Sequence, residues 1–227
     1  EMKYAFCFFP WVGATIGGIT MFWWWFCGKF SVGNMAFAMI GAAIPLAVTG
    51  GFHVDGYMDT MDAFHSYQSR EKKLEILKDS HIGAFAAIML ALYYMIDIAA
   101  ISEIHTQKAV SALAAIFFLA RCFSGIAVMT LQPAKKEGLL YTFASSAQKV
   151  RVKAALYFQA ALCVAIMLLV SGWYGAAAIG AALLSFFYFK KKSYKELGGI
   201  TGDTAGFFVT VCEAAAAAAV AVAGYFL

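Results

Sequence analysis

Long runs of apolar residues separated by short polar segments dominate this chain. A run of about 20 apolar residues is long enough to cross a bilayer as a helix, whose backbone groups bond to one another within the hydrocarbon. The longest run, 154–189, contains no charged residue and has room for two helices that meet near Gly172. The pattern predicts about seven transmembrane helices, at 4–27, 32–54, 83–102, 109–131, two within 154–189, and 204–227. We therefore expect an all-α, polytopic integral membrane helix bundle that forms a single domain over residues 1–227.

Composition supports the membrane class. Hydrophobic residues make up 63% of the chain and charged residues 13%, whereas about 25% of the residues of a soluble domain are charged. The net charge of +4 is too small to indicate a nucleic-acid partner. The five cysteines lie singly, without the spacing of a disulfide framework or a zinc site. The expected partner is the lipid bilayer, and nucleic acid is not expected to bind.

Basic residues are unevenly divided between the two ends of the predicted bundle. All of the 17 Lys and Arg residues except Lys29, Lys108 and Arg121 precede the first span or follow the second, fourth or sixth. Because basic loops stay on the cytoplasmic side, the loops at about 55–82, 132–153 and 190–203 are predicted to face the cytoplasm. The expected location is the cytoplasmic (inner) membrane of a prokaryote. Most of these cations should set topology and contact lipid headgroups, while one or two neutralise an anionic substrate.

Acidic side chains gather at the end of the second predicted span. Asp55, Asp59 and Asp62 have the i, i+4, i+7 spacing of one helix face, where like charges repel. No Lys or Arg occurs between positions 30 and 69 to neutralise them. Carboxylate oxygens select hard cations such as Mg²⁺, Mn²⁺ or Ca²⁺. The group therefore predicts a metal site, and the alternative is a solvated acidic turn of helix.

Two further motifs are predicted at the same face of the membrane. Each combines an aspartate with small residues just before a span: Lys78-Asp79-Ser80 and Thr201-Gly202-Asp203. These residues can complete a metal site or bind phosphates. The alternative for each motif is a helix N-cap, in which Ser80 or Asp203 accepts backbone N–H bonds.

Three charged residues fall inside predicted spans, namely Asp97, Arg121 and Glu213. A lone charge at the bilayer centre costs at least ~2.5–3.5 kcal/mol. One interpretation is mutual pairing that fixes helix packing. The other places Arg121 in a water-filled cavity that faces a phosphate. Asp97 has apolar neighbours and matches no motif, which indicates a structural role.

Taken in order along the chain, these motifs resemble the cobalamin synthase family of adenosylcobinamide-GDP ribazoletransferases. Residues 50–62 (GGFHVDGYMDTMD) resemble the family signature GG-x-H-x-DG-x-x-D-x-x-D, and residues 198–204 (GGITGDT), with Gly206 and Glu213, resemble its GG-x-TGD-x-x-G…E motif. Shorter matches occur at 9–13 (FPWVG), 74–83 (LEILKDSHIG), 120–121 (AR) and 136–139 (KEGL). The resemblance covers nearly the whole chain and departs from the family at His81, where Arg is usual.

The resemblance implies an enzyme that joins adenosylcobinamide-GDP to α-ribazole or its 5′-phosphate with Mg²⁺ (or Mn²⁺), forming adenosylcobalamin (phosphate) and releasing GMP. The metal ligands would be Asp55, Asp59, Asp62, Asp79 and Asp203. The catalytic residues would be Asp59, Asp62 as general base, and Arg121 beside the leaving GMP phosphate. The substrate-binding residues would be Gly50, Gly51, His53, Lys78, Ser80, Arg121, Thr201, Gly202 and Glu213. The oligomeric state stays open, with a homo-oligomer as one option.

Two other functions fit parts of the pattern. A CDP-alcohol phosphotransferase performs similar metal-assisted chemistry, but its DG-x-x-AR motif is not matched by residues 55–60 (DGYMDT). A cation-coupled transporter uses intramembrane acids to mark an ion path, yet most acids here are predicted at one interface.

Overall fold

The computed structural model describes residues 2–135 and 138–226, so Lys136 and Glu137 lie outside the described residues. Within these ranges the regular structure is helical and no strand is formed. The elements in chain order are η1 (Met2–Tyr4), α1 (Ala5–Phe30), α2 (Asn34–Thr49), α3 (Phe52–His65), α4 (Arg70–Ile76), α5 (Ala84–Ser102), α6 (Gln107–Thr130), α7 (Leu139–Ser146), α8 (Lys149–Ser171), α9 (Trp173–Leu197) and α10 (Gly202–Gly224). The all-α prediction is confirmed.

Five straight helices are long and apolar enough to cross a membrane: α1, α5, α6, α8 and α10. The number becomes six if α2 and α3 are counted together. Helix α9 has 25 residues but ends in a lysine-rich turn, which lowers its mean hydropathy. The expected count of about seven is therefore approximate, because one predicted span is broken and another has a polar end.

The break between α2 and α3 lies at Gly50-Gly51. The two helices meet at an angle of 97°. Gly50 has a φ of 62° and Gly51 a φ of 83°, values in the left-handed region that only glycine adopts at little cost. This glycine pair therefore turns α3 away from the direction of α2 and out of the set of straight spans.

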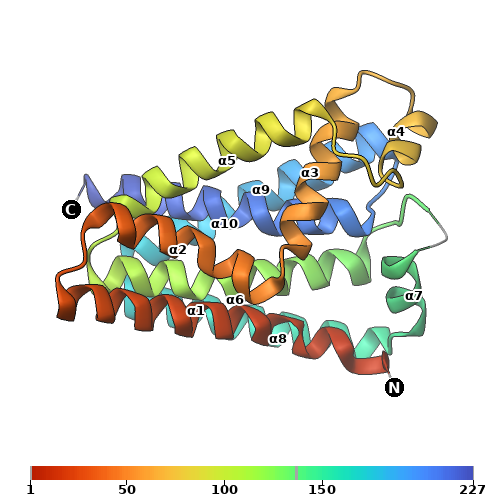
Figure 1. The fold of residues 1–227 in the computed structure, drawn as a ribbon. Coiled ribbons are helices and arrows are strands. Elements are labelled where there is room, and N and C mark those ends of the chain that lie inside the picture. The colour runs from red at the N-terminus through yellow and green to blue at the C-terminus, as the bar shows by residue number, and fades with distance from the viewer. Residues whose placement is uncertain (1, 136–137, 227) are drawn as a thin grey trace.

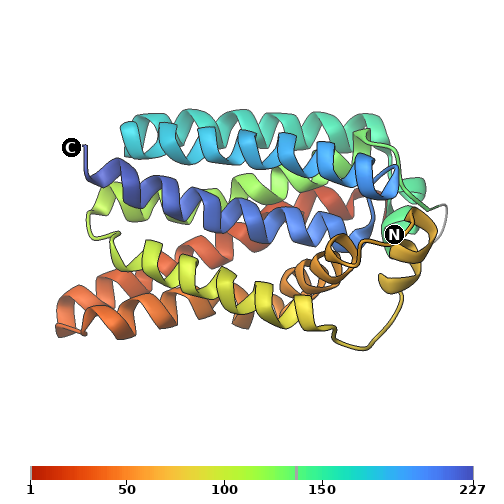
Figure 2. The same cartoon turned by 90° about the horizontal axis from the view of Figure 1, so that it is seen from above.

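The long helices run side by side, and the basic loops share one end of the bundle (Figures 1 and 2). The N-terminus, α4, α7 and the α9–α10 connection lie at this end, while the C-terminus and the α1–α2 and α5–α6 connections lie at the other. The described residues of the segments predicted as loops at 55–82, 132–153 and 190–203 thus lie at one end, although 55–65, 149–153 and 190–197 are parts of α3, α8 and α9 rather than loops. We call this the loop end of the bundle.

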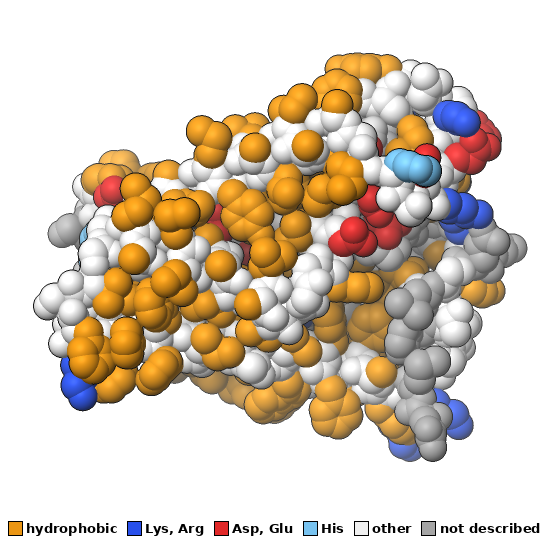
Figure 3. Space-filling view, viewed as in Figure 1, with side chains coloured by type: hydrophobic (Ala, Val, Ile, Leu, Met, Phe, Trp, Pro, Cys, Tyr) orange, Lys and Arg blue, Asp and Glu red, His pale blue; other side chains and the backbone are white. Residues whose placement is uncertain are grey.

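Helices α6 and α10 form the centre of the bundle. Most of their residues are buried, whereas α1, α5 and α8 expose many apolar side chains. Figure 3 shows hydrophobic side chains spread over the face along the bundle, with acidic side chains near α3 and basic ones at the ends. Apolar surface of this extent indicates contact with lipid, so the chain is a membrane protein.

Candidate active site

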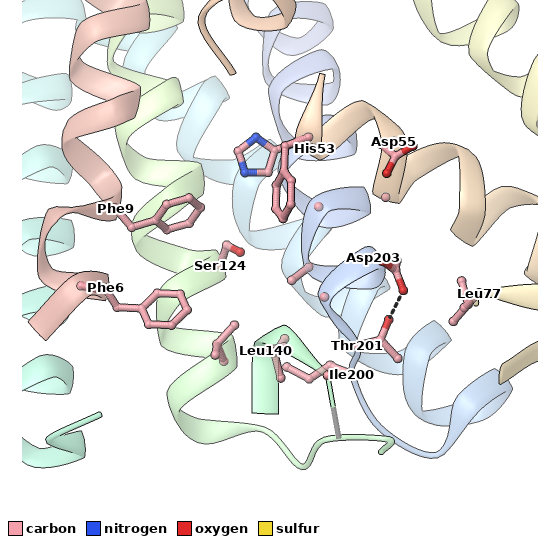
Figure 4. Close-up of a pocket in the computed structure, with 18 of the residues that line it drawn as sticks. Phe6, Phe9, His53, Asp55, Leu77, Ser124, Leu140, Ile200, Thr201 and Asp203 are labelled. Carbon is pink, nitrogen blue, oxygen red and sulfur yellow. Dashed lines mark hydrogen bonds between the residues drawn. The ribbon is translucent and has the colours of Figure 1, made fainter. Parts of the chain in front are cut away.

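A pocket of about 810 Å³ lies at the loop end, where α1, α3 and the start of α10 meet (Figure 4). Its lining includes aromatic, acidic and basic side chains. Those used below are Phe6, Phe9, His53, Asp55, Lys78, Ser124, Lys135, Thr201 and Asp203. We call it the loop-end pocket. Its volume is that of a site for a drug-sized ligand.

Two glycines allow α3 and α10 to touch along their backbones. A Cβ added at Gly56 would lie 2.8 Å from the carbonyl oxygen of Asp203, and one at Gly206 would lie 3.2 Å from that of His53. Side chains at these positions would hold the helices apart. The close approach brings Asp55 of α3 and Asp203 of α10 to the same pocket.

The start of α10 is fixed by a capping box. The Thr204 N–H donates to Thr201 Oγ1 at 3.1 Å, and the Thr201 N–H donates to Thr204 Oγ1 at 2.8 Å. Thr201 is thus the N-cap, and the alternative of a cap by Asp203 is wrong. The Asp203 carboxylate instead accepts a bond from the Thr201 hydroxyl at 3.4 Å and lines the pocket (Figure 4).

Carboxylates from both helices influence one another. In α3, outside the five straight spans, partial burial and then the charges of Asp55, Asp203 and Asp62 raise the pKa of Asp59 to about 6. Like charges this close favour either a bound proton or a bound cation. The acidic group predicted from the spacing is therefore extended by Asp203, a residue from the other end of the chain.

Asp62 is engaged by the next helix. Its Oδ2 accepts the Gly83 N–H at 2.6 Å and its Oδ1 accepts the Ala86 N–H at 2.9 Å. These bonds cap α5, whose own N-cap residue is Gly83 and has no side chain. The alternative of a cap by Ser80 is therefore wrong, because Asp62 from α3 supplies the acceptors.

Asp79 lies apart from the other aspartates. Its Oδ1 is 2.6 Å from His81 Nδ1 and accepts the His81 N–H at 3.0 Å. These bonds hold the pKa of Asp79 below its usual range. Both side chains are exposed and neither lines the loop-end pocket. The structure therefore does not bring the five aspartates predicted as metal ligands into one cluster.

The carboxylates of this site suit a metal ion that protein and substrate bind together better than one enclosed by protein ligands alone. Across 2–135 and 138–226, no three His, Cys, Asp or Glu side chains are placed to hold an ion by themselves. Asp55 and Asp203 line the pocket, and Asp59 is close enough for their charges to raise its pKa; all three offer only hard oxygen ligands. Mg²⁺ is commonly bound by one or two carboxylates together with phosphate oxygens and water. The arrangement fits Mg²⁺ that arrives with a phosphorylated substrate.

Two lysines bring positive charge to the pocket from separate segments. The ion pair between Lys73 Nζ and Glu196 Oε2 (2.5 Å) ties α4 to α9, and Lys78 lies two residues after the end of α4. Lys135 follows α6, and its Nζ donates to the Leu74 carbonyl at 2.7 Å. Both lysines line the pocket with Asp55 and Asp203, so cations and carboxylates surround the same cavity.

Arg121 and Glu213 form an ion pair in the bundle interior. Arg121 Nη1 donates to Glu213 Oε1 at 2.6 Å and to the Phe117 carbonyl at 2.7 Å. Arg121 is fully buried, and neither residue lines the loop-end pocket. Of the two interpretations, the structure matches mutual pairing and does not place Arg121 at a phosphate site.

A family model described as cobalamin-5-phosphate synthase matches residues 1–221. The chain belongs to this family. It is similar to the adenosylcobinamide-GDP ribazoletransferase of Lachnoclostridium phytofermentans, with 41% identity over 223 residues that cover 98% of this chain and 85% of the relative. Those of Clostridium perfringens (strain 13) and Desulforamulus reducens are 29% and 30% identical, covering 93% and 91% of this chain and 84% and 81% of the relatives. No solved structure matches the chain.

In this cobalamin-5-phosphate synthase family member, the predicted substrate residues divide into two groups. Those that line the loop-end pocket are His53, Lys78, Thr201 and Gly202. Those that do not are Gly50, Gly51, Ser80, Arg121 and Glu213. Gly50 and Gly51 contribute indirectly, because the bend that they form positions α3, the helix that carries His53 and Asp55.

Sequence reasoning missed part of the pocket lining. Phe6, Phe9, Ser124 and Lys135 were not predicted as site residues. A signal existed for Phe9, which begins a segment that resembles the family (FPWVG). Nothing in the sequence separates Lys135 from the many other basic residues predicted on that side of the membrane.

Proposed function

We propose that this protein transfers the cobinamide phosphate of adenosylcobinamide-GDP to α-ribazole, or to its 5′-phosphate, in the loop-end pocket. Family membership and the names of the relatives support the reaction. The observation that carries the location is the α3–α10 contact, which sets Asp55 and Asp203 beside Lys78 and Lys135.

The reaction exchanges one phosphorus–oxygen bond for another. A ribose hydroxyl oxygen bonds to the phosphorus that carries cobinamide, and the bond from that phosphorus to the bridging oxygen breaks. GMP leaves with the bridging oxygen, and the hydroxyl proton passes to a base. Such transfers depend on in-line positioning and neutralisation of charge rather than on covalent help from the protein.

The residues of the pocket match these requirements. Lys78 and Lys135 attract the diphosphate of the donor, and Asp55 and Asp203, with Asp59 near enough to respond to their charges, would hold Mg²⁺. When bound, the ion would neutralise charge on the phosphate oxygens. Asp62 was predicted as the base, but α5 occupies both of its oxygens. We therefore assign the proton to a carboxylate of the pocket, Asp55 or Asp203.

The basic loop end also supports an orientation. Because basic loops are retained in the cytoplasm, we place the loop-end pocket at the cytoplasmic face of a prokaryotic inner membrane. Labelling single cysteines introduced at Lys29 and Lys78 with a membrane-impermeant reagent, in cells and in inverted vesicles, tests this orientation. Labelling of position 78 from outside intact cells would contradict it.

Transfer by purified protein tests the function. Detergent-solubilised protein is incubated with adenosylcobinamide-GDP, α-ribazole and Mg²⁺, and the product and GMP are detected by mass. We expect product that disappears with EDTA. Asp55→Asn and Asp203→Asn should lower kcat by on the order of 100-fold, the scale for losing one electrostatic contact to a transition state.

A matched variant controls for the loss of a carboxylate. Asp79 is exposed, bonded to His81 and absent from the pocket lining, so Asp79→Asn should keep near-normal turnover. All variants are compared as monodisperse protein in detergent. Normal turnover by both pocket variants would contradict the site, and no product from the unaltered protein would contradict the function.

A further inference from the structure

The loop-end pocket has two chemically different sides (Figure 4). Phe6 and Phe9 of α1 and His53 of α3 lie on one side, while Asp203 and Thr201 lie on the other. Ser124 of α6 lies between them. The diphosphate chemistry proposed above uses the acidic side and its lysines, which leaves the aromatic side without an assigned ligand.

The rings on the aromatic side form a continuous wall across two helices. The ring centroids of Phe6 and Phe9 are 6.0 Å apart with planes at 83°. Those of Phe9 and His53 are 5.8 Å apart with planes at 52°. Rings at these separations attract one another through edges and faces, and such a wall offers both to a further planar ring.

His53 completes this wall from α3. It is 9% exposed, so most of its ring is packed against neighbouring side chains. Its imidazole has two nitrogens that can take part in hydrogen bonds, whereas the phenyl rings of Phe6 and Phe9 have none. A planar heterocycle that stacks here therefore meets one ring with hydrogen-bonding atoms and two rings without them.

We propose that Phe6, Phe9 and His53 bind the planar aromatic base of the ribazole acceptor, which directs its ribose toward Asp55 and Asp203. This inference rests on the proposed function. It adds the position of one substrate within the pocket, and it makes these residues determinants of acceptor affinity rather than of the transfer step.

The aromatic wall suits the benzimidazole of the acceptor better than the guanine of the donor. Guanine carries an oxo group and an amino group, which need partners when they leave water. The phenyl rings of Phe6 and Phe9 supply none, and an unpaired polar group loses binding energy. The benzimidazole of ribazole has no exocyclic polar group, so an aromatic wall with a single imidazole suits it.

Steady-state kinetics of Phe9→Leu test the proposal. The change keeps an apolar side chain and removes the ring. We expect the KM for α-ribazole to rise by about tenfold, the scale of losing one aromatic–base stack. The KM for adenosylcobinamide-GDP and the kcat at saturating α-ribazole should stay unchanged. Phe9→Tyr, which keeps the ring, should raise the KM for α-ribazole less than Phe9→Leu does.

A control and a direct binding measurement complete the test. Phe22 lies on the same helix, is 60% exposed and is not part of the pocket lining, so Phe22→Leu should leave both KM values unchanged. Isothermal titration of α-ribazole without Mg²⁺ should show binding to the unaltered protein that Phe9→Leu weakens by about tenfold.

The outcomes separate this inference from the proposed function. If the unaltered protein forms product but Phe9→Leu keeps the KM for α-ribazole, the base lies elsewhere and only this inference fails. A rise in the KM for adenosylcobinamide-GDP alone would assign the wall to the donor and also overturn it. If the unaltered protein forms no product, the function fails, and titration still decides whether ribazole binds this wall.

Discussion

Gly56 of α3 lies directly against the backbone of Asp203 at the start of α10. A Cβ at position 56 would be 2.8 Å from the Asp203 carbonyl oxygen and 3.0 Å from its Cα. These are backbone atoms held by the capping box of α10, so they cannot move aside as a flexible side chain can. The separation of the carboxylates of Asp55 and Asp203 therefore depends on the missing side chain of Gly56.

Gly56→Ala should separate the two helices and impair the site. We expect the free energy of unfolding to fall by about 1–3 kcal/mol, as for overpacking elsewhere, and kcat to fall with it. The matched control is Gly18→Ala in α1, where an added Cβ meets nothing within 4 Å. Thermal unfolding in detergent and the transfer assay measure both effects. Normal stability and turnover in Gly56→Ala would show that this contact does not position the aspartates.

The hydrophobic pattern predicted most of the fold because long apolar runs correspond closely to buried or lipid-facing helices. The run at 83–102 became α5, Ala84–Ser102, and the run at 109–131 became α6, Gln107–Thr130. The run at 32–54 was instead divided at Gly50-Gly51. Hydropathy contains no information on φ, and Gly50 and Gly51 were predicted to bind substrate rather than to form a bend.

The site was predicted in part because spacing defines a helix face but not what that face meets. The i, i+4, i+7 spacing placed Asp55, Asp59 and Asp62 together, yet Asp62 bonds to α5 while Asp55 lines the pocket. The pairing of Arg121 with Glu213 was left open for the same reason. A charge within a span requires a partner, and only the packing of α6 against α10 selects which one.

Asp62 is predicted to stabilise α5 rather than to transfer a proton. Asp62→Ala removes both acceptors of the Gly83 and Ala86 N–H groups, and we expect a loss of about 0.5–2 kcal/mol in the free energy of unfolding, typical of a lost N-cap. Asp62→Asn keeps one oxygen and should lose less. The kcat per folded molecule should remain within about twofold, since a cap acts on stability. A large fall in kcat at unchanged unfolding temperature would instead identify Asp62 as the base.

The Arg121–Glu213 pair is predicted to act through packing. Arg121→Ala leaves the Glu213 carboxylate buried without its cation, which costs about 3–5 kcal/mol in other buried pairs. The double variant Arg121→Met, Glu213→Leu removes both charges and should regain most of this stability. Denaturation in detergent and the transfer assay give the two readouts. We expect the double variant to fold and to form product, whereas a folded but inactive double variant would show that Arg121 acts on the phosphate.

The pH dependence of stability should reveal the carboxylate group at Asp59. Burial and the charges of Asp55, Asp203 and Asp62 raise the pKa of Asp59 from 3.8 to about 6, so between these values the folded protein holds a proton that the unfolded chain has released. With EDTA present, the contribution of Asp59 to stability should therefore fall as the pH rises from about 4 to about 6. Asp59→Asn cannot titrate and should lose this part of the fall, whereas Asp79→Asn should keep it.

Mg²⁺ should oppose the same loss, because a cation that binds the ionised carboxylates stabilises the folded state at pH 7. Unfolding temperatures recorded from pH 4 to pH 8, with EDTA and with Mg²⁺, check both effects. Identical profiles for Asp59→Asn and the unaltered protein would show that the carboxylates of α3 and α10 do not repel one another, and the metal proposal would then lose its electrostatic basis.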